Sequence, residues 1–295
     1  MTTHRTRIQI TERDLDVLTA IDAFPMTAAQ LLAYSETFPE PFTQPRLAQR
    51  RLHALEASGY VRSWPYAMAS TGRSPGYFKL TRQGYTLLHG DECVLPQRRY
   101  FEPIADAHHY HTRRLADFLI HLAVTGHRQG IGVRRFAREN SIRIEAEGFT
   151  LYPDAAFQLL AADGRTFNFV VELDNGTERV RSKQDVESIS RKIRGYDAHQ
   201  AGFDAFDPRR YVVLFVTTRS QVRTDNILKT ARELMRNPQR LVFLGIDLEA
   251  FLHRDDPVST ACFTDPRGRK FSLIPKAQRV ATTKASVQTE AAALW

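Results

Sequence analysis

Three carboxylates lie near the ends of two consecutive apolar segments in the middle of the chain. Asp154 follows Pro153 at the start of the first segment, and Glu172 and Asp174 close the second, after the run Phe-Asn-Phe-Val-Val. Side chains alternate along a strand, so Glu172 and Asp174 are expected on the same face. The short connection AADGR predicts a hairpin, which would bring Asp154 close to this pair. Three converging carboxylates form a hard oxygen site suited to Mg²⁺ or Mn²⁺.

A cation is also expected because closely held anions are tolerated only when a metal ion or a raised pKa relieves their repulsion. The helix expected at about 182–199 contains Lys183 and Lys192, and either could hold a nucleophilic water or stabilise charge on a phosphoryl group. We favour Lys192, because it lies beside the apolar stripe of the helix, whereas Lys183 lies in the first turn. The predicted catalytic residues are therefore Asp154, Glu172, Asp174 and Lys192, of which the three carboxylates are the predicted metal ligands.

Each of these residues also has a purely structural interpretation. Asp154 could cap the start of a strand, Asp174 could belong to an Asp-Asn-Gly turn, and Lys192 could be a solvated helix residue. Glu172 is harder to explain in this way, because an unpaired carboxylate on an apolar strand is costly to bury. Glu172 therefore carries the strongest signal for function.

The N-terminal region has the pattern of a DNA-binding fold. Helices expected at 11–24, from Thr27 and at roughly 44–58 precede a two-stranded ribbon, which is the order of a winged helix-turn-helix. The third helix has a stripe expected to be buried, formed by Ala48, Leu52 and Leu55. The residues expected to contact DNA are Arg46, Arg50 and His53 in the major groove, and Arg62, Arg73 and Lys79 toward phosphates. Arginines on an exposed helix can also serve only to solvate it, but the order of the elements favours DNA.

Charge and composition agree with a nucleic-acid partner. Lys and Arg number 41 against 33 Asp and Glu, and the resulting formal charge of +8 favours polyanions. No run approaches the roughly 18 apolar residues of a membrane span. The two cysteines are too few for a disulfide framework or a cysteine-rich zinc site. We therefore expect a cytoplasmic protein without membrane insertion.

The length of 295 residues predicts two domains. The second domain should combine α+β and α/β features, because a meander of strands ending at 166–174 precedes a helical crossover. The expected organisation is a winged-helix DNA-binding domain at 1–90, a linker at 91–106, an αβ domain at 107–275 and a disordered tail at 276–295.

The order of motifs in the second domain resembles the PD-(D/E)XK nuclease fold over roughly 105–250. Asp154 follows a proline, and Glu172 follows in the next strand with one residue before a polar partner. The resemblance implies a restriction-endonuclease-like mixed sheet with flanking helices. Asp174 stands where that motif has lysine, so the lysine must come from elsewhere in the chain or the domain is inactive.

The two halves together resemble the replication-relaxation family of plasmid and mobile-element proteins, which includes the MOBC class of conjugative relaxases. His111 opens the helix before the nuclease-like core, and the other matching segments are TERDLDVL, RRLHALEASGYV, PDAAF, VVELDNGTE and KIRGY. The resemblance spans about 11–220. It implies a DNA-binding winged helix joined to a metal-dependent nuclease-type domain that nicks at a transfer origin.

The segment His109-Tyr110-His111 allows a different interpretation, since relaxases of another type hold a metal with two histidines flanking one residue. Those histidines lie on a strand, whereas this segment runs into the amphipathic pattern TRRLADFLIHL. We therefore favour a helix start.

The expected function is a DNA-binding protein with a Mg²⁺-dependent or Mn²⁺-dependent nickase or relaxase domain, acting in plasmid or mobile-element mobilisation or replication. The alternative is a non-catalytic, sequence-specific DNA-binding regulator or replication accessory with a degenerate nuclease domain, and an adaptor for another mobilisation protein is a third candidate. The expected partners are double-stranded DNA at a transfer or replication origin, and mobilisation or coupling proteins.

Overall fold

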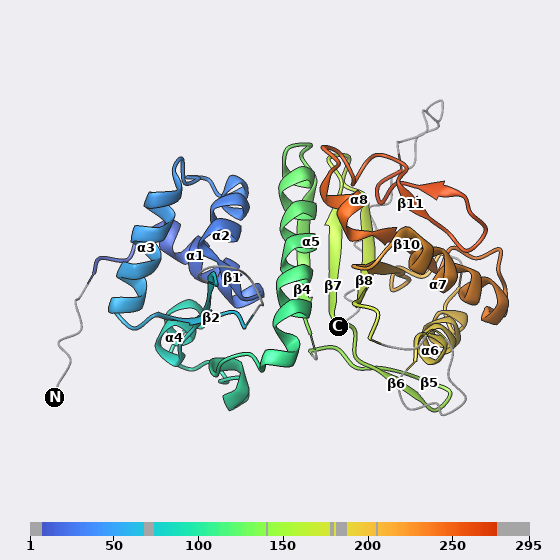
Figure 1. The fold of residues 1–295 in the computed structure, drawn as a ribbon, viewed down its shortest axis with the longest axis horizontal. Coiled ribbons are helices and arrows are strands. Elements are labelled where there is room, and N and C mark those ends of the chain that lie inside the picture. The colour runs from blue at the N-terminus through green and yellow to red at the C-terminus, as the bar shows by residue number, and fades with distance from the viewer. Residues whose placement is uncertain are drawn as a thin grey trace. The chain divides into compact units, whose positions relative to one another are not determined.

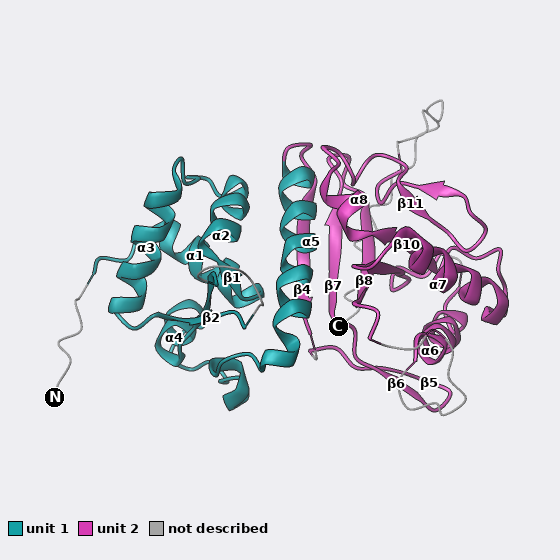
Figure 2. Cartoon of the chain, viewed as in Figure 1, with its two compact units in different colours: residues 1–127 teal, residues 128–295 magenta. Residues whose placement is uncertain are grey.

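The chain forms two compact units, residues 1–127 and residues 128–295 (Figure 2). The computed structural model describes residues 8–67, 74–139, 141–177, 180, 188–204 and 206–275. The expected disordered tail, Arg73 and Lys183 lie outside the described residues. Among the residues described, no helix is both long enough and apolar enough to span a membrane.

Unit 1 has the predicted order of helices followed by a ribbon. Its elements are α1 (Glu12–Ala23), β1 (Met26–Thr27), α2 (Ala28–Tyr34), η1 (Ser35–Thr37), α3 (Pro45–Ala57), β2 (Val61–Pro65), β3 (Gly76–Leu80), α4 (Arg82–His89), η2 (Arg98–Phe101), η3 (Asp106–His108) and α5 (His109–His127). The three strands form an antiparallel sheet in the order β1-β3-β2.

Local sequence signals explain where the first helices begin and which face they bury. Thr11 and Asp14 form a reciprocal capping box at the start of α1. Pro45 occupies the first turn of α3, where its missing N–H costs nothing. Ala48, Leu52 and Leu55 are buried on α3, which confirms the predicted stripe.

A buried ion pair joins α3 to α1. Nε of Arg51 donates to Oδ1 of Asp14 at 2.5 Å, and a second guanidinium nitrogen contacts Oδ2. The Asp14 side chain is 1% exposed. Burial alone would raise the pKa of this carboxyl, but the hydrogen bonds from Arg51 and Thr11 outweigh burial and lower it. The pair therefore fixes the orientation of α3 on α1.

The boundary between the units lies after His127, whereas the sequence predicts a boundary after residue 106. α5 begins at His109, close to the predicted start, but it packs against α2. Nε2 of Gln30 on α2 donates to Oδ1 of Asp117 at 2.7 Å and approaches the carbonyl of Arg113 at 3.4 Å. These polar contacts place the helix with unit 1.

Unit 2 is a mixed sheet flanked by helices (Figure 1). Its elements are β4 (Gly132–Arg138), β5 (Ile144–Ala146), β6 (Phe149–Leu151), β7 (Ala155–Leu160), β8 (Thr166–Asp174), α6 (Ile189–Ala201), β9 (Val212–Thr217), α7 (Gln221–Leu234), β10 (Phe243–Asp247), α8 (Leu248–Leu252), β11 (Phe263–Thr264) and β12 (Lys270–Phe271).

The seven-stranded sheet has the order β12-β11-β10-β9-β8-β7-β4. β4, β7 and β8 form an antiparallel meander, and the predicted hairpin between β7 and β8 is confirmed. β8, β9 and β10 are parallel, with α6 and α7 in the two crossovers. The carboxyl ends of β8 and β9 therefore lie side by side.

Two helices cover one face of this sheet and contact each other (Figure 1). Ile189 and Ile193 of α6 and Ile227 of α7 share one core with Val170 of β8 and Val213 of β9. The even-numbered residues of β8 therefore face these two helices.

The hairpin of β5 and β6 packs against α6 at Gly195. A Cβ atom at this position would lie 2.8 Å from Cδ1 of Leu151 and 3.1 Å from Cβ of Phe149. The glycine in the middle of α6 thus permits a close approach that another residue would obstruct. The hairpin and the sheet together fix the helix that carries Lys192.

The Arg51 pair predicts a large difference between two adjacent arginines on α3. We expect Arg51→Ala to lower the free energy of unfolding by about 2 kcal/mol, because the buried Asp14 loses its charged partner. Arg50 is exposed, so Arg50→Ala should change stability by less than about 0.5 kcal/mol. Urea denaturation of the two variants and the parent measures both values, and equal destabilisation would contradict the role of the pair.

Candidate active site

Glu172 is buried inside unit 2 and contacts two residues of α6. The phenol of Tyr196 donates a hydrogen bond to Oε1, and Nζ of Lys192 lies 2.8 Å from Oε2. The Glu172 side chain is 3% exposed, and Tyr196 is completely buried. A carboxylate, an ammonium and a phenol thus meet where β8 passes under α6.

Burial controls the protonation of Glu172. It raises the pKa of this carboxyl to about 7, although the charge of Lys192 favours ionisation, and the nearby charge of Asp154 raises the pKa further. The Tyr196 pKa is raised well above its ordinary value by burial and by Glu172, so the phenol keeps its proton for the hydrogen bond. Lys192 therefore carries most of the charge compensation.

Asp154 lies across the hairpin from Glu172. Ala155 pairs with Val171 in the antiparallel register, so the preceding residue, Asp154, lies opposite Glu172. Oδ2 of Asp154 accepts a hydrogen bond from the backbone N–H of Leu173 at 2.7 Å. This bond holds the Asp154 carboxylate against β8, as the predicted hairpin requires.

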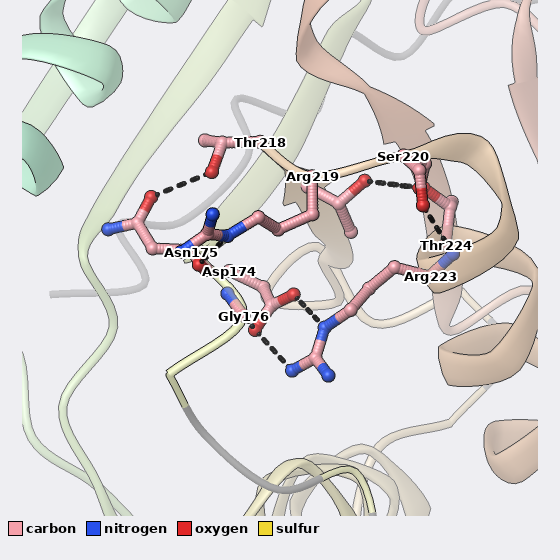
Figure 3. Close-up of polar contacts among 9 residues, drawn as sticks. Asp174, Asn175, Gly176, Thr218, Arg219, Ser220, Arg223 and Thr224 are labelled. Carbon is pink, nitrogen blue, oxygen red and sulfur yellow. Dashed lines mark hydrogen bonds and ion pairs between the residues drawn. The ribbon is translucent and has the colours of Figure 1, made fainter.

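Asp174 lies in a different electrostatic environment. The Arg223 guanidinium near the start of α7 donates to both of its carboxylate oxygens, at 2.5 and 2.8 Å. Figure 3 shows this bidentate pair facing away from Asn175, whose backbone carbonyl accepts a hydrogen bond from Nε of Arg219. The backbone N–H of Gly176 also donates to Oδ1 at 3.2 Å. Asp174 thus anchors the turn after β8 to α7.

These contacts change the predicted metal site. Glu172 and Asp174 do share the face of β8 that meets the helices, but each one is neutralised by a different helix. In the parts of the chain that the structure describes, no three acidic, histidine or cysteine side chains form a group that could hold a metal ion. The predicted cluster of three carboxylates is therefore wrong. Asp154 and Glu172 lie together, and Asp174 pairs with Arg223.

A pair of carboxylates still fits Mg²⁺ or Mn²⁺. Mg²⁺ is commonly held by one or two carboxylates, with waters and substrate phosphate oxygens completing its coordination. Oε2 of Glu172 accepts no hydrogen bond from another described residue besides its contact with Lys192. Both residues could therefore contribute an oxygen to an ion, and Asp174 could not without losing Arg223.

Lys192 lies beside the buried stripe of α6, as predicted from the spacing of the apolar residues in this helix. Its side chain extends from the buried face of the helix to Glu172, 20 residues away in sequence, as the apolar stripe of the helix indicates. Tyr196 was not predicted as a site residue. Its spacing of one turn from Lys192 was the available signal, because residues i and i+4 share a helix face.

The residues of α3 and β2 that the sequence predicts to contact DNA have exposed side chains. Arg46, Arg50 and His53 are exposed on the side of α3 opposite the buried stripe. Arg62 is exposed on β2, with its guanidinium 5.1 Å from the centre of the Trp64 ring. These four side chains are accessible to a ligand.

The position of Lys79 differs from the expectation that it faces DNA phosphates. It lies on the central strand of the three-stranded sheet and is only 9% exposed. Its Nζ donates to the carbonyl of Glu102 at 2.5 Å and approaches that of Arg99 at 3.4 Å. Lys79 therefore holds part of the expected linker against β3 and is not positioned to contact phosphate.

His109 has a structural role. Its Nδ1 accepts a hydrogen bond from the backbone N–H of Ala67 at 2.6 Å, so Nε2 must carry the proton that reaches the carbonyl of Ile104 at 2.9 Å. Both ring nitrogens are used at the start of α5. The interpretation as a helix start is confirmed.

Comparison with known proteins identifies a family. A protein-family model described as replication-relaxation matches residues 21–211, which includes α3, β7, β8 and α6. No curated protein and no solved structure gives a significant match.

The raised pKa of Glu172 predicts a pH-dependent contribution to stability. The unfolded carboxyl ionises near 4.5 and the folded one near 7, so its contribution is complete below pH 4.5 and is lost as the pH rises to 7. We expect this loss to be roughly 3 kcal/mol. Urea denaturation in EDTA at pH 4.5, 6 and 8 should show it as a pH-dependent difference between the parent and Glu172→Gln. A difference that stays constant over this range would mean that folding does not shift the pKa of Glu172.

Proposed function

The chain belongs to the replication-relaxation family, and from this premise we propose that it is a DNA-binding protein whose second unit cleaves a phosphodiester bond with Mg²⁺ or Mn²⁺. The cleavage would serve replication or mobilisation of a plasmid or integrative element. The single observation that carries the proposal is the buried Glu172 carboxylate, which is held by Lys192 and lies opposite Asp154.

The positions of these residues support a PD-(D/E)XK nuclease site as the proposal. Such a site would need an acidic residue at the start of one strand, a second in the next strand and a lysine amine beside them. Asp154 and Glu172 would fill the two acidic positions, and Lys192 of α6 would supply the amine that the sequence lacks at Asp174. A lysine from a helix can replace one from a strand because only the position of the ammonium matters to the chemistry.

Each residue then has a distinct role in hydrolysis. A bound Mg²⁺ would polarise the scissile phosphate and lower the pKa of a coordinated water. Asp154 and Glu172 would hold the ion, and Tyr196 donates to Oε1 of Glu172, which leaves Oε2 beside Lys192. The Lys192 ammonium would stabilise the charge that develops on the phosphoryl oxygens as water attacks phosphorus.

Unit 1 supports the DNA-binding part of the proposal. The order of its helices and ribbon is that of a winged helix, in which the third helix enters the major groove. Arg46, Arg50 and His53 lie together on the exposed side of α3. We therefore propose that α3 is the recognition helix and that Arg62 contacts the DNA backbone.

A second candidate function is a DNA-binding replication accessory without nuclease activity. The observation that favours it is the salt bridge between Asp174 and Arg223, which removes a carboxylate from the expected ligand set. Asp174 and Arg223 would then be part of a scaffold, and the second unit would serve only in recognition or assembly.

Cleavage assays can separate these functions. We expect the parent to nick supercoiled plasmid DNA that carries the sequence flanking its own gene, in Mg²⁺ or Mn²⁺. Asp154→Asn and Lys192→Met should lower the rate by about a hundredfold or more, because the first weakens binding of the metal ion and the second removes the cation that stabilises charge on the phosphate. Gel electrophoresis of nicked and supercoiled forms gives the rates.

Lys229→Met is the matched control, since Lys229 is an exposed lysine on α7. Its rate should equal that of the parent. A parent that binds this DNA but leaves it intact with either metal ion would favour the accessory function.

DNA binding should depend on α3. We expect Arg46→Ala and Arg50→Ala each to weaken binding of a duplex about tenfold and to reduce its salt dependence, because each removes a cation from the DNA interface. Fluorescence anisotropy between 50 and 200 mM salt measures both effects. Arg232→Ala, at an exposed arginine of α7, should leave both unchanged. Equal losses in all three variants would argue for a diffuse charge effect and against a recognition helix.

A further inference from the structure

Unit 2 contains a pocket of about 750 Å³ at the end of β8 remote from Glu172. Phe167 of the pocket and Glu172 are roughly 17 Å apart along this strand. Its lining is largely apolar, with aliphatic side chains and the phenylalanines Phe167, Phe206 and Phe271, and it also includes two cations, Arg210 and Lys270, the amide of Asn168 and the carboxylate of Asp207. None of them contributes to the candidate active site.

The phenylalanines give the pocket an accessible aromatic surface. Phe206 is 97% exposed. The guanidinium groups of Arg165 and Arg269, which do not line the pocket, lie 5.4 and 5.3 Å from the ring centres of Phe167 and Phe271. Accessible aromatic rings form the kind of surface on which a flat heterocycle stacks.

The pocket lining also carries positive charge. Lys270 donates to the hydroxyl of Thr264 at 2.7 Å, and no carboxylate among the described residues forms an ion pair with it. Asp207, the carboxylate in the lining, is neutralised by two hydrogen bonds from Arg209, at 3.1 and 2.8 Å. An anionic group would be attracted to this side.

Hydrogen bonds hold the segment that carries Arg210 in place. Nδ2 of Asn168 donates to the carbonyls of Pro208 and Arg210, at 2.8 and 3.0 Å. Its Oδ1 in turn accepts a hydrogen bond from Gln158 at 2.9 Å. The amide is therefore fully used in tying this segment to β8 and β7, and the pocket wall is formed before a ligand binds.

We propose that this pocket binds an unpaired nucleotide, with its base against Phe206, Phe167 and Phe271 and its phosphate toward Arg210 and Lys270. A purely aliphatic ligand would offer no charge to Arg210 and Lys270, and an inorganic anion would leave the aromatic rings uncovered. A nucleotide of a duplex has its base stacked and paired, so the ligand is a free nucleotide or a nucleotide of a single strand.

Binding of fluorescent dT10 in EDTA tests the proposal. The full chain with Arg46→Ala and Arg50→Ala serves as the parent, so that the N-terminal surface contributes little. Phe206→Ala should weaken binding about five- to tenfold, because stacking of one base is lost. Folding should be unaffected, since Phe206 is almost fully exposed. Lys270→Gln should also weaken binding, and Lys229→Gln, at an exposed lysine of α7, should not.

An abasic decamer of the same length separates stacking from charge. It should bind more weakly than dT10, and Phe206→Ala should not weaken it further. Competition by thymidine monophosphate would assign the pocket to a free nucleotide, and competition only by dT10 would assign it to a strand.

Unchanged dT10 affinity in Phe206→Ala, or equal affinity for the abasic decamer and dT10, would overturn the proposal. Failure of the nicking assay would not affect it, because no residue of the pocket lies in the candidate active site.

Discussion

The neutralisation of one buried carboxylate, Glu172, constrains most of unit 2. An ionised carboxyl in an apolar core is tolerated only with a charged partner and hydrogen bonds, and Lys192 and Tyr196 supply both. Both residues come from α6, so this helix must lie across the end of β8 in one register. Gly195 allows the hairpin of β5 and β6 to pack against the same helix from another side. The packing of α6 and the chemistry of the site thus depend on each other.

Two ion pairs connect β8 to two different helices on the same face of the sheet. Glu172 meets α6 and Asp174 meets α7, and the two helices also contact each other. This separation lowers the negative charge that a metal ion would encounter from three carboxylates to two. It also gives Asp174 a clear structural function, because Arg223 ties the turn after β8 to the helix that follows β9.

Neighbouring arginines on helix α3 have different roles, one in stability and the others in the proposed recognition of DNA. Arg51 points inward to Asp14, whereas Arg46 and Arg50 remain exposed. The inward pair fixes the helix, and the exposed pair can then present a defined surface to DNA. A rigid helix reduces the entropy that binding must overcome, so the buried salt bridge contributes indirectly to the proposed recognition.

The sequence by itself determined the elements and the faces they bury. The bounds of β8, the buried stripe of α3 and the β7–β8 hairpin all follow from local periodicity and turn residues. Only the tertiary structure decided which charges meet. Arg223 lies 49 residues from Asp174, and Lys79 is covered by a segment that has little periodicity of its own. Such pairings depend on how helices and loops pack onto a sheet, and the spacing of residues within one element carries no information about that packing.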